Sequence, residues 1–194
     1  MNNIIKTVLI FTLVVSITSC NPDKKSEEFT QTKLDEVKEK VFPEDFLGVY
    51  KGDLKITTSK GTQKLPMEFH LSSTANTDHF NYVIYYGEER DPRNYNLERT
   101  HDPNLFLVDE NNGIVLESAY ADQTLYSTYE VMGNLLHSTE IFYDDRMEFM
   151  IAMARVMDTS TTGNAESAIV KNYPMSILQR ATLYKQADSI NTSK

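Results

Sequence analysis

The side chain with the clearest chemical potential in this sequence is the thiol of Cys20, the only cysteine in 194 residues. It follows an apolar run, residues 7–17, and the two small polar residues Thr18 and Ser19. A single cysteine has no partner for a disulfide within the chain, and an exposed free thiol is a liability in an oxidising compartment. As a helix the apolar run would span about 17 Å, well short of the ~30 Å hydrocarbon core of a bilayer. We therefore interpret residues 1–19 as a signal peptide that ends directly before the thiol.

The segment Ile17-Thr18-Ser19-Cys20 resembles the lipobox of bacterial lipoprotein signal peptides. In that family a peptidase cuts before the cysteine, which then carries a diacylglycerol on its sulfur and an acyl chain on its amine. The resemblance implies that Cys20 is the lipid attachment site and that these covalent chains, with no other cofactor, hold the protein on a membrane. It implies a lipoprotein of the cell envelope, in the outer membrane of a Gram-negative bacterium. The alternatives are an ordinary secretory signal that contains a thiol, or a buried core cysteine.

Residue types that perform catalysis are present, but their spacing marks no known catalytic centre. The sequence has no nucleophile elbow, no Gly-rich phosphate loop and no Ser/Lys motif of an acyl enzyme. The four histidines, His70, His79, His101 and His137, lack the i, i+2 or i, i+4 spacing that would bring two of them to one metal ion. We therefore predict neither an enzyme nor a metal site, and we name no catalytic residue.

Acidic residues outnumber basic residues, and the formal net charge is −9. A surface of this sign repels the phosphates of nucleic acids and anionic lipid headgroups. The sequence therefore predicts no nucleic-acid partner, and it leaves attachment to a membrane to the lipid on Cys20.

Composition divides the chain into four segments. We predict a signal peptide at 1–19, a lipidated flexible tether at 20–30, a single folded domain at 31–187 and a polar tail at 188–194. Helix-forming residues at Gln31–Val41, with apolar side chains at helical spacing, predict a short helix where the folded domain begins.

From Phe46 onward apolar and polar residues alternate with a period of two, which is typical of half-buried β-strands. The pattern occupies segments near 50–56, 64–71, 80–86, 94–100, 105–109, 114–121, 124–132, 135–143, 147–157 and 177–185, and residues 159–167 are expected to form a flexible loop. Most of the connections are short, and short connections require antiparallel neighbours. Closing such a sheet removes both of its edges. We predict an all-β fold, an antiparallel up-and-down β-barrel of about ten strands, with a two-sheet β-sandwich as the alternative.

The start of the first predicted strand, Phe46-Leu47-Gly48-Val49-Tyr50-Lys51-Gly52, resembles the opening of lipocalin and fatty-acid-binding barrels. Those barrels have a Gly-x-Trp motif after a short helix. Its aromatic side chain plugs the closed end, and a basic side chain from a late strand packs over it. The resemblance puts Tyr50 in the place of the tryptophan and implies that Arg155 or Arg180 covers it.

The inward faces of the predicted strands mix apolar side chains with scattered hydroxyls, which suits a cavity that orients an amphipathic guest. A packed core whose hydroxyls reach the rim would have the same pattern. The register that we predict for 135–143 turns His137 inward, on the same face as Leu135 and Ile141. Our candidate cavity residues are Tyr50, Tyr82, Tyr129, His137 and Phe149.

These observations lead to two hypotheses about function. The first is a lipid-anchored envelope lipoprotein whose barrel binds a small apolar or amphipathic ligand. The second is a protein-interaction module of the envelope, with a barrel filled by side chains and an exposed apolar face for a protein partner. The first requires an interior cavity, and the second requires a solid interior.

Overall fold

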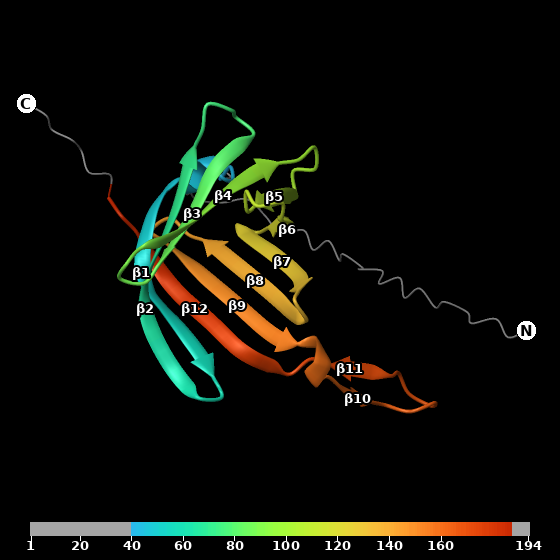
Figure 1. Ribbon diagram of the computed structural model, residues 1–194. Coiled ribbons are helices and arrows are strands. Elements are labelled where there is room, and N and C mark those ends of the chain that lie inside the picture. Colours follow the sequence, from blue (N-terminus) through green and yellow to red (C-terminus); the bar gives the residue numbers. More distant parts are fainter. Residues whose placement is uncertain (1–39, 188–194) are drawn as a thin grey trace, which may run out of the picture. The chain divides into compact units, whose positions relative to one another are not determined.

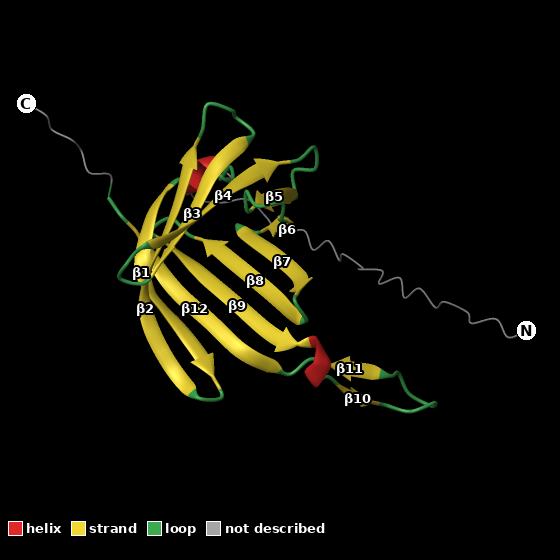
Figure 2. Ribbon diagram, in the orientation of Figure 1, coloured by secondary structure: helices red, strands yellow, loops and turns green. Residues whose placement is uncertain are grey.

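A computed structural model describes residues 40–187, and almost all of the regular structure in that range is β-strand (Figures 1 and 2). The strands are β1 (Gly48–Thr58), β2 (Gly61–Ser73), β3 (His79–Tyr86), β4 (Asp91–Arg99), β5 (Leu105–Asp109), β6 (Val115–Ala121), β7 (Thr124–Val131), β8 (Asn134–Phe142), β9 (Arg146–Arg155), β10 (Ser160–Thr162), β11 (Val170–Asn172) and β12 (Met175–Lys185). Two short 3-10 helices, η1 (Glu44–Phe46) and η2 (Val156–Asp158), accompany them.

Ten of these strands form one closed antiparallel barrel. From β1 to β9 each strand pairs with the next one in the sequence, and β12 pairs with both β9 and β1 to complete the ring. The closing register runs from Tyr50 opposite Lys185 to Thr58 opposite Ile177. The predicted all-β up-and-down barrel is confirmed, and the closed ring excludes the two-sheet sandwich.

Alternation of side chains places the core inside this ring. In β1, Tyr50 and Leu54 are buried while Lys51 and Lys55 are exposed, as a period of two requires when one face of a sheet is covered. The turn between β1 and β2 ends at Gly61, whose φ of +125° is a conformation that L side chains rarely adopt. Glycine at this corner therefore allows the tight reversal that joins the first two strands.

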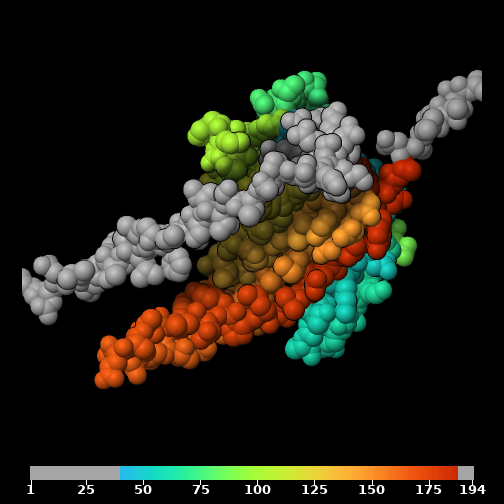
Figure 3. Space-filling view, turned by 180° about the vertical axis from the view of Figure 1, so that it is seen from behind, coloured from blue at the N-terminus to red at the C-terminus, as the bar shows by residue number. Residues whose placement is uncertain are grey.

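The connection between β9 and β12 differs in part from the flexible loop that we expected for residues 159–167, because residues 160–162 form a strand and 163–167 belong to the turn that follows it. Its strands β10 and β11 pair antiparallel, from Ser160 opposite Asn172 to Thr162 opposite Val170, as a separate two-stranded sheet. This hairpin projects from the barrel where β9 ends and β12 begins (Figures 1 and 3). All residues of β10 and β11 are exposed, so there was no alternation of burial from which to predict them.

The chain enters the described range just before η1. The helix predicted for Gln31–Val41 lies almost entirely outside that range, and Lys40 and Val41 are not helical. The predicted signal peptide, the tether with Cys20 and the polar tail also lie outside it. Between residues 40 and 187 no helix has the length and apolarity needed to cross a membrane.

Aromatic side chains fill the end of the barrel that carries η1, which we call the closed end. The Phe42 ring is stacked on Tyr120 with centroids 4.4 Å apart, and it meets Phe106 edge-on at 5.1 Å. Arg99 on β4 donates a hydrogen bond of 2.9 Å to the carbonyl oxygen of Phe42 and so ties the chain before η1 to the barrel. Aromatic pairs of this kind contribute about 0.5–1.5 kcal/mol beyond the area they bury. The opposite end, with the turns at 59–60, 87–90 and 110–114, we call the open end.

Candidate functional site

The barrel interior contains a cavity of about 100 Å³ in the half nearer the open end. Its wall combines tyrosines, serines and two carboxylates with aliphatic side chains and one phenylalanine, all from the segment that runs from β3 to β9. The lining residues are Tyr82, Ile84, Tyr86, Tyr95, Val108, Glu110, Leu116, Ser118, Leu125, Ser127, Tyr129, Ser138, Glu140, Phe149 and Ile151. The interior is therefore filled at the closed end and hollow beyond it.

The size of the cavity limits what can enter it. Its volume equals that of about three water molecules in the liquid, at ~30 Å³ each. Sites for drug-sized ligands are larger, at roughly 300–1,000 Å³. The cavity thus suits a ligand of a few non-hydrogen atoms, or the end group of a longer one.

Glu140 on β8 is the buried charged residue of this cavity, with 7% of its surface exposed. Its Oε1 accepts a hydrogen bond from the hydroxyl of Tyr82 on β3. Its Oε2 is buried and has no hydrogen-bond partner among the residues that the structure describes. Burial raises the pKa of Glu140 to about 7, although the Tyr82 hydrogen bond acts in the opposite direction. Near neutral pH the carboxyl group therefore changes readily between its two protonation states.

The phenol groups around Glu140 keep their protons at neutral pH. Burial raises the pKa of the Tyr82 hydroxyl well above its usual value, and the Glu140 carboxylate raises it further. Burial is also the main cause that raises the pKa of Tyr86, Tyr95 and Tyr129. The cavity therefore presents hydroxyl groups that can both donate and accept hydrogen bonds.

Two serines complete the polar part of the wall between β6 and β7. The backbone pairing of these strands covers only the stretch from Ala119 opposite Tyr126 to Ala121 opposite Thr124. Next to it, the hydroxyls of Ser118 and Ser127 share a hydrogen bond of 2.6 Å, and both residues are buried. Because serine side chains are small, these two inward positions leave part of the interior unfilled, and this space belongs to the cavity.

The structure brings three of the five predicted cavity residues together. Tyr82, Tyr129 and Phe149 all line the cavity. Tyr50 also points inward, but it lies at the closed end, where its hydroxyl donates a hydrogen bond of 2.5 Å to the carbonyl oxygen of Phe46. Burial raises the pKa of Tyr50 to about 12. Tyr50 is therefore part of the filled end and not of the cavity wall.

The predicted inward position of His137 is wrong. Its two ring nitrogens lie 2.8 Å from Oγ1 of Thr128 and 3.3 Å from Oγ1 of Thr139, in an exposed and a half-buried contact respectively. On the same strand, Ser138 and Glu140 line the cavity, and His137 is not among the lining residues. Since successive side chains of a strand point to opposite faces, His137 faces outward. A register error of one residue moves every side chain of a strand to the other face.

The error arose because β8 carries apolar residues on both of its faces. Leu135 and Ile141 belong to the outer face, while Phe142, which is 1% exposed, belongs to the inner face. Alternation alone could not decide between the two faces, and a carboxylate is normally assigned to solvent. Phe142 is a large apolar residue that should point inward. Because residues two apart on a strand share a face, Phe142 could have indicated that Glu140 also lies inside.

The residue over Tyr50 also differs from the one that the lipocalin resemblance implied. The Nζ of Lys185 lies 5.8 Å from the centre of the Tyr50 ring. Arg180 is exposed on the outer face of β12, and Arg155 is exposed at the end of β9. Gly48 leaves the space for the lysine, because a Cβ there would lie 2.7 Å from the Lys185 Cε.

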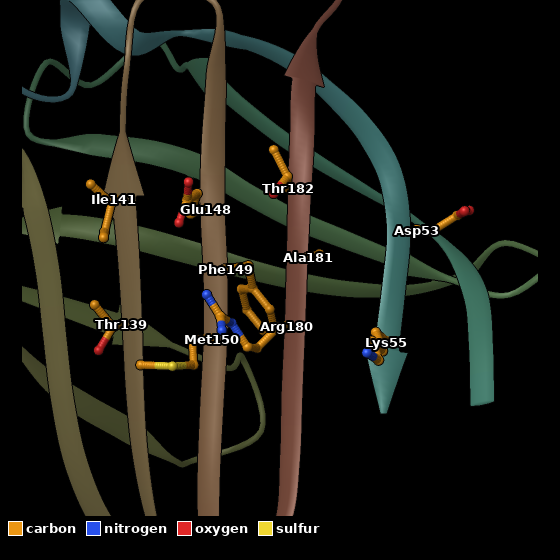
Figure 4. A pocket seen from close by; sticks show the side chains of 10 residues that line it. All are labelled: Asp53, Lys55, Thr139, Ile141, Glu148, Phe149, Met150, Arg180, Ala181 and Thr182. Carbon is orange, nitrogen blue, oxygen red and sulfur yellow. The ribbon is translucent and has the colours of Figure 1, made fainter. Parts of the chain in front are cut away.

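A second hollow, a groove of about 320 Å³, lies on the outside of the barrel. Figure 4 shows the residues that line it on β8, β9, β12 and β1, namely Thr139, Ile141, Glu148, Phe149, Met150, Arg180, Ala181, Thr182, Asp53 and Lys55. Of these, Phe149 and Ala181 are buried core residues at the base of the groove. The groove mixes both signs of charge with the apolar side chains of Ile141 and Met150. It contains no buried charged group comparable to Glu140.

The chemistry of the interior site must be inferred from its own residues. Within residues 40–187 no group of three or more His, Cys, Asp or Glu side chains is arranged to hold a metal ion. What the Glu140 cavity offers is one buried carboxyl group, phenol and serine hydroxyls, and an aliphatic wall. No protein-family model matches this chain, and no curated protein matches it.

Proposed function

We propose that this protein is a lipid-anchored envelope protein whose barrel binds one small amphipathic ligand in the cavity around Glu140. The observation that carries the proposal is Oε2 of Glu140, a buried carboxylate oxygen without a hydrogen-bond partner in residues 40–187, at the wall of a cavity. Leaving a buried polar atom unpaired costs about 1–3 kcal/mol. A ligand that donates a hydrogen bond to Oε2 removes this cost, and the aliphatic wall accommodates its apolar part.

The closed ring of strands supports this proposal. Every strand that contributes to the cavity wall has a paired neighbour on both sides, although β6 and β7 pair only from Ala119 opposite Tyr126 to Ala121 opposite Thr124. Most of the backbone of the wall is therefore held in place before a ligand arrives. A preformed site loses less conformational entropy on binding than a flexible one. A cavity in a closed barrel can therefore bind even a small ligand, which has few contacts of its own.

The lipid anchor rests on the sequence around Cys20, which lies outside the described residues. Each buried methylene contributes ~0.8 kcal/mol to membrane binding, and two or three acyl chains give lasting attachment. Replacing Cys20→Ser should move the protein from the membrane fraction to the soluble fraction of its host. If the variant stays with the membrane, the anchor is something other than a lipid on Cys20.

Native mass spectrometry of the full chain, purified from its host under mild conditions, tests the ligand. We expect a reproducible extra mass that is released by organic solvent. The variant Ser138→Leu fills the cavity from β8 and should lose that mass, whereas His137→Leu, its neighbour on the outer face, should retain it. An extra mass that survives Ser138→Leu in a folded protein would place the ligand elsewhere, and a bare mass from several preparations would reject the proposal.

One observation favours the second candidate function, a protein-interaction module. Large apolar side chains are exposed around the β10–β11 hairpin, among them Met157, Ile169, Val170 and Met175, and Met157 is 89% exposed. Exposed apolar groups that cluster often mark a protein contact. A photo-crosslinking amino acid at Met157 should then give a discrete product in intact cells, while one at Lys60 on the β1–β2 hairpin should not. If native mass spectrometry finds no bound ligand and the cross-linked product appears, the protein-interaction function is favoured.

A further inference from the structure

We infer that the ligand of the interior cavity is a small amphipathic cation, such as a short primary amine, whose ammonium group binds the carboxylate of Glu140. This inference rests on the proposed function, namely that the cavity binds a ligand at all. It adds the charge and the chemical class of that ligand, and it depends on the composition of the wall and on the geometry of one carboxylate.

The charge of the cavity wall has one sign. Two carboxylates, Glu140 and Glu110, are among the lining residues, and no lysine, arginine or histidine is among them. An anionic ligand would bring a third negative charge into a site of low dielectric and would be repelled. A cation gains from both carboxylates, and Glu110, which is only partly buried, lies where a cation can approach from solvent.

The geometry of Glu140 leaves one oxygen for the ligand. Oε1 already accepts the hydrogen bond from Tyr82, and Oε2 has no partner in the described part of the chain. An ammonium group has three donors and no acceptor. One N–H can bind Oε2 while the other two reach hydroxyl oxygens of the wall. A charged donor to a carboxylate makes a shorter and stronger hydrogen bond than a neutral donor.

Aromatic rings add a second attraction for a cation. The rings of Tyr82 and Tyr95 are stacked with their centroids 6.1 Å apart, and both side chains line the cavity together with Tyr86 and Tyr129. The face of an aromatic ring attracts a cation, and this contribution grows when the cation is desolvated. The tyrosines thus favour a cation over a neutral molecule of the same size.

The rest of the wall requires an apolar body on the ligand. Ile84, Leu116 and Ile151 line the same cavity and offer no polar atom. A volume of about 100 Å³ admits only a short chain behind the ammonium group. The amine of a longer molecule fits equally well if its remainder leaves the cavity beside Glu110.

Binding of a cation should depend on pH, because only the ionised form of Glu140 attracts it fully. The other titratable groups in the wall are Tyr82 and Tyr86 on β3, Tyr95 on β4, Glu110 after β5 and Tyr129 on β7. β9 contributes only Phe149 and Ile151. Arg93 on β4 acts electrostatically on Tyr86 and Tyr95, but it is not a lining residue, and it is exposed and paired with Asp91. The tyrosines stay protonated, and Glu140, whose pKa is raised to about 7, changes charge inside the cavity between pH 6 and pH 8.

Three probes with the same carbon chain separate charge from shape: n-butylammonium, 1-butanol and butyrate. Each is titrated into the full chain labelled with ¹³C at the glutamate carboxyls and at the isoleucine methyls. We expect saturable shifts at Glu140 and Ile151 with butylammonium, weaker binding of butanol and none of butyrate. In Glu140→Gln the affinity for butylammonium should fall by about tenfold or more. Glu117→Gln, which removes an exposed outer carboxylate on β6, should bind as the parent protein does.

The affinity of the parent protein for butylammonium should also rise by about tenfold between pH 6 and pH 8, because the probe stays charged as a lysine does while Glu140 ionises. In Glu140→Gln it should not change with pH. If butyrate binds more tightly than butylammonium, or if Glu140→Gln binds butylammonium as tightly as the parent, the inference is wrong although the cavity remains a ligand site. If no probe shifts Ile151, the proposed function itself fails.

Discussion

The hydroxyl of Tyr82 on β3 donates a hydrogen bond to Oε1 of Glu140 on β8, and the two residues are 58 positions apart in the sequence. This bond crosses the barrel interior and fixes one oxygen of a buried carboxyl group. The other oxygen, Oε2, is buried and has no hydrogen-bond partner among the described residues, and Glu140 is one of the residues that line the cavity. The pair therefore both stabilises the interior and orients the group to which we assign ligand binding.

The first prediction concerns the pH dependence of stability. Burial raises the pKa of Glu140 from 4.5 to about 7 in the folded protein. Between these values the unfolded chain releases the proton while the folded protein keeps it, so the free energy of unfolding falls as the pH rises. The total loss is about 3 kcal/mol, it is complete slightly above pH 7, and below pH 4.5 the effect is absent.

Urea unfolding of the full chain at pH 4.5, 6 and 8 measures this effect. Glu140→Gln has no proton to release, so its stability relative to the parent should increase by about 3 kcal/mol from the lowest to the highest pH. Glu117→Gln on the exposed face of β6 is the control and should follow the parent. The same pH dependence in Glu140→Gln and in the parent would show that Glu140 is not the buried acid.

The second prediction isolates the Tyr82 hydrogen bond. Tyr82→Phe leaves both carboxylate oxygens of Glu140 without a hydrogen bond from residues 40–187 and should lower the free energy of unfolding by about 1–3 kcal/mol at neutral pH. Because this bond lowers the pKa of Glu140, its loss should move the pH dependence of stability to higher pH. Tyr126→Phe, on the exposed face of β7, should change neither quantity. Equal costs for the two substitutions would mean that the interior bond contributes nothing.

The sequence predicted inward faces correctly where the opposite face was polar. On β7 the alternation of Leu125, Ser127 and Tyr129 with Thr128 and Glu130 placed the first set inside. β9 is apolar on both faces, and there too Phe149 was correctly placed inside, with Glu148 next to it on the outer side. On β7 the polar residues of the outer face were enough to orient the strand, because the pleat fixes all other residues.

The remaining features depend on contacts that no single strand reveals. Glu140 points inward where it accepts a hydrogen bond from Tyr82 on β3, and the sequence of β8 alone does not indicate this partner. The boundary between the filled and the hollow part depends on Phe42 and η1 entering one end of the barrel, with Phe42 stacked on Tyr120. Interior volume is a property of packing around the whole ring, so alternation predicts which side chains face inward but not whether they touch.

The third prediction concerns the close approach of β1 and β12. A Cβ at Gly52 would lie 2.4 Å from the carbonyl oxygen of Thr182, which is part of the paired backbone and cannot move without disturbing the ladder. Gly52→Ala should therefore lower the free energy of unfolding by about 1–3 kcal/mol. Lys55→Ala, an exposed position on the same strand, should stay within ~0.5 kcal/mol of the parent. If Gly52→Ala leaves the free energy of unfolding unchanged, β1 and β12 must be separated more widely than the paired register of the barrel implies.

The fourth prediction tests which base stabilises the closed end. The Nζ of Lys185 lies 5.8 Å from the centre of the buried Tyr50 ring, a distance at which a cation is attracted to the ring face. Lys185→Gln should lower the free energy of unfolding by about 1 kcal/mol. Arg180→Gln, on the exposed outer face of the same strand, should change it by no more than ~0.5 kcal/mol. Thermal and urea unfolding of both variants give the comparison. A larger cost for Arg180→Gln than for Lys185→Gln would instead support the arginine that the lipocalin resemblance implied.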